Sequence, residues 1–406
     1  MEIKNLIDHF REIYSHLIDF IENEENGILN YKEFKEYLLN LHFENNKEEF
    51  KEFLQIIVKI IDDHSRQSNF YCNIEQIFLS LSSLIKETLT NLEIFNLFKN
   101  CRRVLLLLIQ NDIINIDKSI VRLMIQSNSG LQDQRYVSYF FPEIKKYLKK
   151  DTVARFEREL RIIDKNIFDD FEGKRLKGEN EAYICSLIRN DSVEEFVTYI
   201  SRSNISISST IKKSIFESNT FLIKNDPTLI EYAAFFGSIQ IMKYLAYNGC
   251  ELNPSLWIYA IHGRSPDVIH YLNEVKVIPK DETFTECFEE AIKCHQNNFA
   301  EYIENNLLNK EDNENNVNYF GIQYHNYNYF PANLDNQSLF FLSCQYNYLY
   351  IVKFLLKNES IDLNAKRNVI YKEMIEYYDE DEAMLLSELN DLFDEEILRY
   401  TLKVFI

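Results

Sequence analysis

The sequence predicts an all-α fold, in which an N-terminal helical bundle is followed by an α-solenoid of repeated helix pairs. The chain of 406 residues contains only 8 glycines and 6 prolines, so few tight hairpins are expected. Apolar residues recur at helical spacing through the first 175 residues. Beyond Glu181 one short pattern returns along the chain, and such a return at intervals is typical of stacked repeats.

Composition and length indicate a folded protein with more than one domain. Hydrophobic residues make up 46% of the chain and aromatic residues 14%, which is enough to form compact cores. A chain of 406 residues usually divides into two or three domains. We predict an N-terminal helical domain at 1–175, a repeat domain at 176–366 and an acidic helical C-terminal cap at 367–406.

The net charge and the cysteine content indicate which kind of partner the protein binds and in which cellular compartment it lies. The formal net charge of −20 disfavours nucleic acid, because affinity for phosphates depends on Lys and Arg. A protein partner, of basic character if charged, is expected instead. Neither a secretory signal nor an apolar run long enough to span a membrane is found, which favours the cytoplasm. The seven scattered cysteines are predicted to be reduced core residues: Cys72, Cys101, Cys185, Cys250, Cys287, Cys294 and Cys344.

The first 175 residues contain several amphipathic helical patterns. The first of them follows alternating steps of four and three: Ile3, Ile7, Phe10, Tyr14, Leu17 and Ile21. Such a seam could pair with a second chain, but about three heptads is the lower limit for a coiled coil. A bundle within one chain is preferred, so a monomer is favoured and the oligomeric state stays open. Further faces of this kind are Phe50, Phe53, Leu54, Ile57, Val58 and Ile61, and later Ile94, Phe95, Phe98, Val104, Leu105, Leu108 and Ile109.

The segment DPTLIEYAAFFGSIQIMKYLAYNGCELN, 226–253, resembles one ankyrin repeat, which consists of two antiparallel helices and a turn. Its small residues Ala233 and Ala234 let the first helix lie close to its neighbours. Gly237 suits the bend between the helices, and Gly249 suits a left-handed helix end. The buried face of the second helix is formed by Ile241, Tyr244 and Leu245.

The same register returns along the chain, so we expect degenerate ankyrin-type repeats. The second-helix pairs are Tyr199 and Ile200, Tyr244 and Leu245, Tyr271 and Leu272, Tyr302 and Ile303, and Phe354 and Leu355. The small first-helix position recurs as Ala233, Ala260, Ala291 and Ser343. One such unit cannot cover its own apolar faces, whereas stacked neighbours can.

The repeats are irregular in length. Successive pairs lie 45, 27, 31 and 52 residues apart, whereas ankyrin repeats have a period of about 33. The short periods leave little chain for projecting β-hairpin fingers, so family binding positions cannot be transferred directly. The long gaps contain inserts at 201–225 and 304–337. The Asn- and Tyr-rich insert 304–337 is either disordered or a contact loop, since tyrosine is enriched at interfaces.

A narrower resemblance covers 136–364. The segments AYICSLIRNDSVEEFVTYI, SIFESNTFLIKNDPTLIEYAAFFGSIQIMKYL and SLWIYAIHGRSPDVIHYL are similar to an abundant family of ankyrin-type proteins of uncharacterised function in single-celled parasitic eukaryotes. This resemblance implies a helical leader followed by degenerate repeats. It implies no catalytic residues.

No catalytic, cofactor-binding or metal-binding residue is predicted. The segment GKRLKGEN, 173–180, lacks the Lys and Ser or Thr of a phosphate loop and is read as a solvated linker. Cys294 and His295 are neighbours in the chain, and adjacent helical residues point to different faces. Trp257 matches apolar first-helix positions and is assigned to the core. His262 and His270 are assigned to a turn and a helix surface.

Calcium binding is the first alternative function. The segment ENEENGILNYKEF can be aligned with an EF-hand loop, with Gly27 sixth and oxygen ligands from Glu22, Glu24, Asn26, Ile28, Asn30 and Glu33. The glutamates at the first and third positions crowd the ion, and no second loop is found. A polar turn between two helices explains the same residues.

The preferred function is a non-enzymatic scaffold that binds a partner protein through the ankyrin-type surface. An enzyme whose site is assembled from distant residues is the second alternative. A structure without a pocket of convergent polar groups would count against it.

Overall fold

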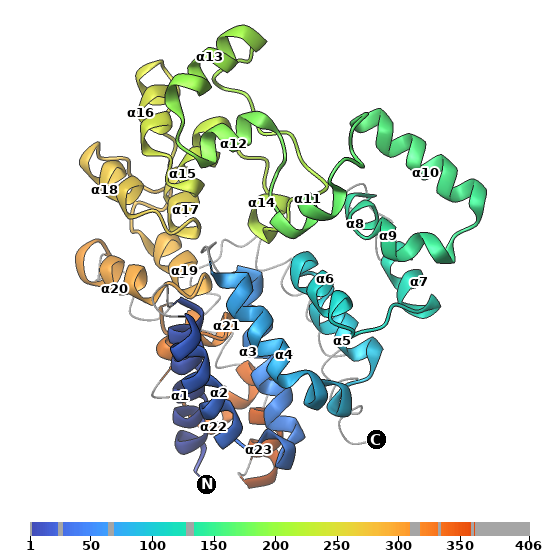
Figure 1. The fold of residues 1–406 in the computed structure, drawn as a ribbon. Helices are drawn as coiled ribbons and strands as arrows, with labels where there is room; N and C mark the ends of the chain where they lie inside the picture. Colours follow the sequence, from blue (N-terminus) through green and yellow to red (C-terminus); the bar gives the residue numbers. More distant parts are fainter. Residues whose placement is uncertain are drawn as a thin grey trace, which may run out of the picture. The chain divides into compact units, whose positions relative to one another are not determined.

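The structure is a computed structural model that describes residues 2–22, 27–63, 69–126, 134–308, 317–331, 334–358 and 361. Every regular element in these ranges is a helix, so the all-α prediction is confirmed (Figure 1). The chain divides into two compact units. The larger unit comprises 13–312, and the smaller unit combines 1–12 with the described residues after 313.

Residues up to 12 belong to the smaller unit, and the rest of the N-terminal part of the chain belongs to the larger unit. Helices fill this N-terminal part, because each of them has an apolar face to bury. They are α1 (Ile3–Glu22), α2 (Gly27–Asn40), α3 (Lys47–Asp63), α4 (Phe70–Thr88), α5 (Asn91–Phe98), α6 (Arg102–Gln110), α7 (Lys118–Gln126), α8 (Gln134–Tyr139), α9 (Phe141–Ile144), α10 (Lys150–Ile163) and α11 (Phe171–Lys177). Single 3₁₀ turns occupy Phe43–Asn45 and Lys145–Tyr147. Thr90 begins α5 with a capping box that includes Glu93.

The predicted seam of α1 is covered within this chain. Tyr14, Leu17 and Ile21 are buried in the larger unit. Asn73 of α4 donates hydrogen bonds of 3.2 Å to the carbonyls of Phe20 and Ile21 at the end of α1. These contacts favour the intramolecular bundle over a coiled coil with a second chain.

Helix pairs follow one another between residues 183 and 306. They are α12 (Tyr183–Arg189) with α13 (Val193–Ser203), α15 (Leu229–Phe236) with α16 (Ile239–Tyr247), α17 (Ser255–His262) with α18 (Pro266–Glu274), and α19 (Thr285–Lys293) with α20 (Asn297–Asn306). The short helix α14 (Thr220–Lys224) lies within the first insert. First helices pack on one another in chain order, from α12 through α15 and α17 to α19. Figure 1 shows the second helices α13, α16, α18 and α20 in a row beside them.

Each pair turns through a residue in the left-handed conformation. This residue is Asp191, Gly237, Arg264 or His295, with φ of 49°, 69°, 56° and 56°. The amide of the following residue bonds to the carbonyl five positions earlier, as in Ser238 to Ala233 (2.9 Å) and Gln296 to Ala291 (2.9 Å). This closure satisfies carbonyls that the end of a helix leaves free. Gly237 thus lies in the bend to which the sequence assigned it, and Gly249 is left-handed, as predicted, with φ 94°.

Matching positions of the pairs have matching surroundings. The small first-helix residues Ala233, Ala260 and Ala291 are fully buried. In the second helices the aliphatic member is buried in every pair of the larger unit: Ile200, Leu245, Leu272 and Ile303. The aromatic member is half-buried at Tyr199, Tyr244 and Tyr271 and just exposed at Tyr302.

Side-chain hydrogen bonds join neighbouring pairs. Ser238 Oγ donates to the carbonyl of Ile188 (2.5 Å), and Gln296 Nε2 donates to the carbonyl of Ile261 (2.7 Å). Both donors follow the left-handed residue of their own pair. Both acceptors lie three residues before the left-handed residue of the preceding pair. The pairs are therefore held in one common register.

The smaller unit repeats this turn twice. It contains α21 (Val317–Gln323), the 3₁₀ turn η3 (Tyr327–Tyr329), α22 (Asn336–Gln345) and α23 (Leu349–Asn358). His325 and Asn347 are left-handed, and Tyr348 donates through its hydroxyl to the carbonyl of Ile322 (2.9 Å). Part of the insert 304–337 is thus a further, shortened helix pair. This pair lies within the 52-residue interval that the sequence analysis assigned to an insert.

The predicted boundary between 175 and 176 falls inside α11. Arg175 is buried there and binds Glu143 at 2.7 Å and Glu172 at 2.6 Å, so the prediction of a solvated linker at 173–180 is wrong. A buried guanidinium is tolerated because two carboxylates pair with it. The predicted cap at 367–406 lies outside the described residues.

Candidate functional site

Exposed apolar side chains occur where the second helices of two consecutive pairs end. Tyr247, the last residue of α16, is 92% exposed. Val275, directly after α18, is 41% exposed, and Ile278 is 59% exposed. Large apolar residues with this exposure in consecutive pairs are typical of contact surfaces. We call Tyr247, Val275 and Ile278 the apolar edge.

The opposite end of the pairs is covered by the N-terminal helices. Arg264, in the turn after α17, forms an ion pair of 2.9 Å with Glu22 of α1. His295, in the turn after α19, is buried, and its Nδ1 lies 3.0 Å from the hydroxyl of Tyr14. The turns after α17 and α19 are therefore occupied by the chain itself.

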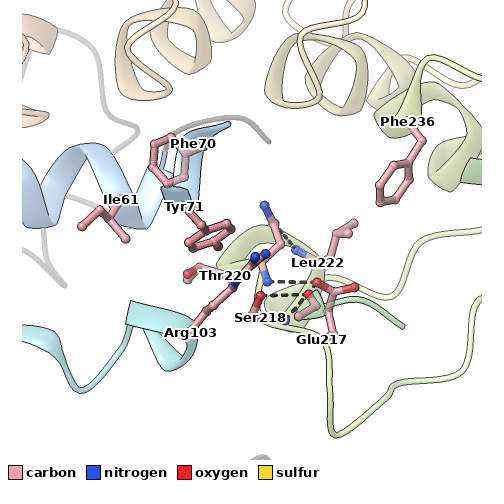
Figure 2. Close-up of a pocket in the computed structure, with 11 residues that line it drawn as sticks. Ile61, Phe70, Tyr71, Arg103, Glu217, Ser218, Thr220, Leu222 and Phe236 are labelled. Atoms are coloured by element: carbon pink, nitrogen blue, oxygen red, sulfur yellow. Dashed lines mark hydrogen bonds between the residues drawn. The ribbon is translucent and has the colours of Figure 1, made fainter. Parts of the chain in front are cut away.

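A small hollow lies where α4 and α6 meet the segment before α14. Figure 2 shows Tyr71 and Arg103 on one side and Glu217 and Ser218 on the other. The guanidinium carbon of Arg103 lies 3.8 Å from the centre of the Tyr71 ring, and Arg103 donates to the carbonyl of Lys177 (3.0 Å). The enclosed volume is about 20 Å³. That space suits one water molecule, whereas ligand sites usually measure about 300–1,000 Å³.

The polar groups of this hollow hold the chain in place. The carboxylate of Glu217 accepts hydrogen bonds from the amides of Asn180, Ser218 and Asn219 at 3.3, 3.0 and 2.9 Å. Burial lowers the pKa of Arg103, although its neighbours oppose this shift. Arg103 and Glu217 therefore line the hollow while their polar groups bond to the chain around it.

A second polar cluster is buried between α17 and α19. His262 ends α17, and its Nδ1 lies 2.8 Å from Oε1 of Glu290 and 3.1 Å from Sγ of Cys294. Cys294 Sγ lies 3.5 Å from Oε1 of Glu290. Glu290 and Cys294 are four residues apart, so one turn of helix brings them to the same face. Lys293 binds the other oxygen of Glu290 at 3.0 Å.

Burial and neighbouring charges set the protonation of this cluster. Burial by itself raises the pKa of Glu290, but hydrogen bonds and positive charge from His262 and Lys293 outweigh it and lower the pKa to about 2. Burial, and after it the charge of Glu290, raises the pKa of the Cys294 thiol well above its usual range. Glu290 is therefore ionised and Cys294 is a neutral thiol at neutral pH.

This geometry does not suit nucleophilic catalysis. A base that activates a thiol usually uses one ring nitrogen for the thiol and the other for the orienting acid. Here the same atom, Nδ1 of His262, faces both Cys294 and Glu290. A buried neutral thiol also lacks the thiolate character that a nucleophile needs.

Of the two histidines assigned from the sequence in this region, only one has the predicted environment. His270 is exposed, as predicted, but His262 is buried, so its assignment to a turn or surface is wrong. The trio with Glu290 and Cys294 was missed. Two signals could have found it. Glu290 and Cys294 have a one-turn spacing, and aligning Trp257 with Phe288 places His262 level with Lys293 in the next pair.

The other predicted residues have clear positions. Trp257 is buried, as predicted, and its indole donates to the carbonyl of Val277 (2.8 Å). Cys72 is exposed, which departs from the predicted core position. Tyr327 and Phe330 of the insert are buried, so these aromatics pack the smaller unit and do not form a contact loop.

The residues aligned with an EF-hand loop do not have the structure of such a loop. Helix α1 continues to Glu22, and α2 already begins at Gly27, the sixth position of the aligned loop. A calcium loop keeps its ligands on about twelve residues that wrap the ion, whereas only four residues separate these helices. Glu22, the proposed first ligand, instead pairs with Arg264.

No known protein family, curated protein or solved structure matches this chain. In the described part of the chain, none of the helices has the length and apolar character needed to cross a bilayer.

Proposed function

We propose that this protein is a non-enzymatic interaction scaffold that binds a partner protein through degenerate ankyrin-type repeats. The observation that supports the proposal best is the stack of helix pairs at 183–306. Ala233, Ala260 and Ala291 occupy equivalent buried positions in that stack. Stacked pairs form an extended surface, and such surfaces are used for binding.

The partner binds at the apolar edge in this proposal. The turns after α17 and α19, at the other end of their pairs, contact α1 through Glu22 and Tyr14. The apolar edge is exposed in the same unit and carries Tyr247, a residue type favoured at interfaces. The net charge of −20 favours a basic partner and disfavours nucleic acid. Cytoplasmic localisation and reduced cysteines belong to the same proposal.

Affinity purification of the full-length chain from its native cells tests this function. The test variant combines Tyr247→Ser, Val275→Ser and Ile278→Ser. The control variant combines Ile162→Ser and Ile163→Ser, which remove exposed apolar side chains of α10 (83% and 68% exposed) away from the pairs.

Quantitative mass spectrometry should show a protein that the wild type and the control retain and the edge variant loses by about tenfold, which corresponds to about 1.4 kcal/mol. Equal recovery by all three chains would contradict binding at the apolar edge. Failure of any protein to co-purify above background would contradict the scaffold function itself.

A further inference from the structure

We propose that His262, Glu290 and Cys294 form a binding site for a divalent transition-metal ion of the zinc class. Nδ1 of His262, Oε1 of Glu290 and Sγ of Cys294 all lie within 4.8 Å of one another. The three residues are buried between consecutive helix pairs, so a bound ion would tie α17 to α19.

The spacing of the donor atoms is close to that of a tetrahedral site. Zinc binds nitrogen and oxygen at about 2.0 Å and sulfur at about 2.3 Å, which places tetrahedral ligands about 3.3–3.6 Å apart. The observed separations are 2.8 Å between Nδ1 and Oε1, 3.1 Å between Nδ1 and Sγ, and 3.5 Å between Sγ and Oε1. Small side-chain rotations, of about half an ångström, would therefore admit an ion.

The donor types select the metal. A thiolate and an imidazole favour zinc and related borderline ions, whereas calcium and magnesium prefer oxygen ligands alone. Neighbouring side chains already orient the ligands. Lys293 holds the second oxygen of Glu290 at 3.0 Å, and the ring of Phe221 stacks on the ring of His262 with centroids 4.2 Å apart. Such outer contacts usually fix metal ligands in position.

Binding releases two protons to solvent. The S–H bond of Cys294 breaks and a metal–sulfur bond forms, and the proton on Nδ1 of His262, which faces Glu290 at 2.8 Å, leaves so that this nitrogen can donate its lone pair. Ionised Glu290 donates a lone pair without losing a proton.

Cobalt titration of the full-length protein, purified with a chelator and then freed of it, tests the site. The wild type should bind one equivalent of Co²⁺ with a thiolate-to-cobalt charge-transfer band, and Zn²⁺ should abolish that band. Cys294→Ser should lose the band. The matched control Cys287→Ser removes another buried cysteine of α19 and should keep it. A band that survives in Cys294→Ser and disappears in another cysteine variant would overturn the assignment.

X-ray absorption of the zinc-loaded wild type tests the same site without any variant. One sulfur at about 2.3 Å with the remaining ligands nitrogen or oxygen at about 2.0 Å is the expected result. A shell with no sulfur or with several sulfurs, or no bound zinc after dialysis, would overturn the proposal. The expected melting temperature rises with zinc concentration, since an ion that binds only the folded state stabilises it.

Discussion

Single residues fix the close approach of neighbouring helix pairs. Gly263 follows α17, and a Cβ added to it would lie 1.8 Å from the carbonyl oxygen of Phe235 in the preceding pair. No side chain fits there without moving backbone. At Gly249 the backbone conformation, not the space, favours glycine. Its φ is 94°, and no atom lies within 4 Å of an added Cβ.

Gly263→Ala should therefore lower the free energy of unfolding by about 3 kcal/mol, the upper part of the range for overpacking. Gly249→Ala is the control and should cost about 1 kcal/mol, since only its left-handed backbone is strained. Urea denaturation measures both changes. Equal costs for the two variants would show that the contact with Phe235 is not limiting.

Asp62 predicts a pH dependence of stability. Burial raises its pKa above the usual 3.8, although a hydrogen bond from Cys101 (2.8 Å) opposes the shift. The folded state then binds more protons than the unfolded state as pH rises above about 3.8. Stability contributed by Asp62 is therefore lost with rising pH.

Asp62→Asn should remove this loss and keep an acceptor for Cys101. Urea denaturation at pH 4 and pH 8 should show little difference from the wild type at the lower pH and a more stable variant at the higher pH. A variant equally or more destabilised at pH 8 would mean that the ionised carboxylate is stabilising.

At this scale the sequence predicted residues that depend on their own helix. Trp257 was assigned to the core from its register, and Gly237 to the bend from its lack of a side chain. His262 could not be assigned in this way, because its partners Glu290 and Cys294 come from the next pair. No local pattern around His262 indicates them.

Among the helices, the hydrogen bond between Ser238 and the carbonyl of Ile188 joins the first two helix pairs. That carbonyl also accepts from the amide of Asp191 at 2.9 Å, so Ser238→Ala removes one of its two donors and should cost about 1 kcal/mol. Ser201→Ala is the control, because Ser201 bonds within its own helix to the carbonyl of Val197 at an exposed position.

The control should change the free energy of unfolding by no more than about 0.5 kcal/mol. Urea denaturation measures the free energy of unfolding of both variants. A cost for Ser238→Ala as small as that of the control would mean that packing alone, without the hydrogen bond, sets the register.

The sequence predicted most helix pairs, because their second helices keep an aromatic residue followed by an aliphatic one. The pair α21 and η3 was missed. Its second element is a three-residue 3₁₀ turn, too short to show helical spacing. Gly321 stands at the small position, where a Cβ would lie 1.9 Å from the carbonyl oxygen of Tyr329. The backbone of Tyr329 therefore lies closer to this position than an alanine side chain would allow.

Over the whole molecule, contacts between α1 and the turns after α17 and α19 leave those two turns less open to a partner than the apolar edge. Glu22 and Arg264 are 242 residues apart in the chain, and so no local signal predicts their ion pair. The same is true of Tyr14 and His295. The apolar edge could be proposed only once these contacts were known.

The central claim is that consecutive helix pairs stack as equivalent neighbours, and coupling free energies test it most directly. Ile230→Val, Trp257→Phe and Phe288→Leu alter matching buried positions of α15, α17 and α19. Double-mutant cycles by urea denaturation should give coupling of at least about 0.5 kcal/mol between neighbours, Ile230 with Trp257 and Trp257 with Phe288. Ile230 and Phe288, which belong to pairs one step further apart, should be additive within about 0.3–0.5 kcal/mol. Coupling between Ile230 and Phe288 as large as that between neighbours, or none in any cycle, would contradict the stack.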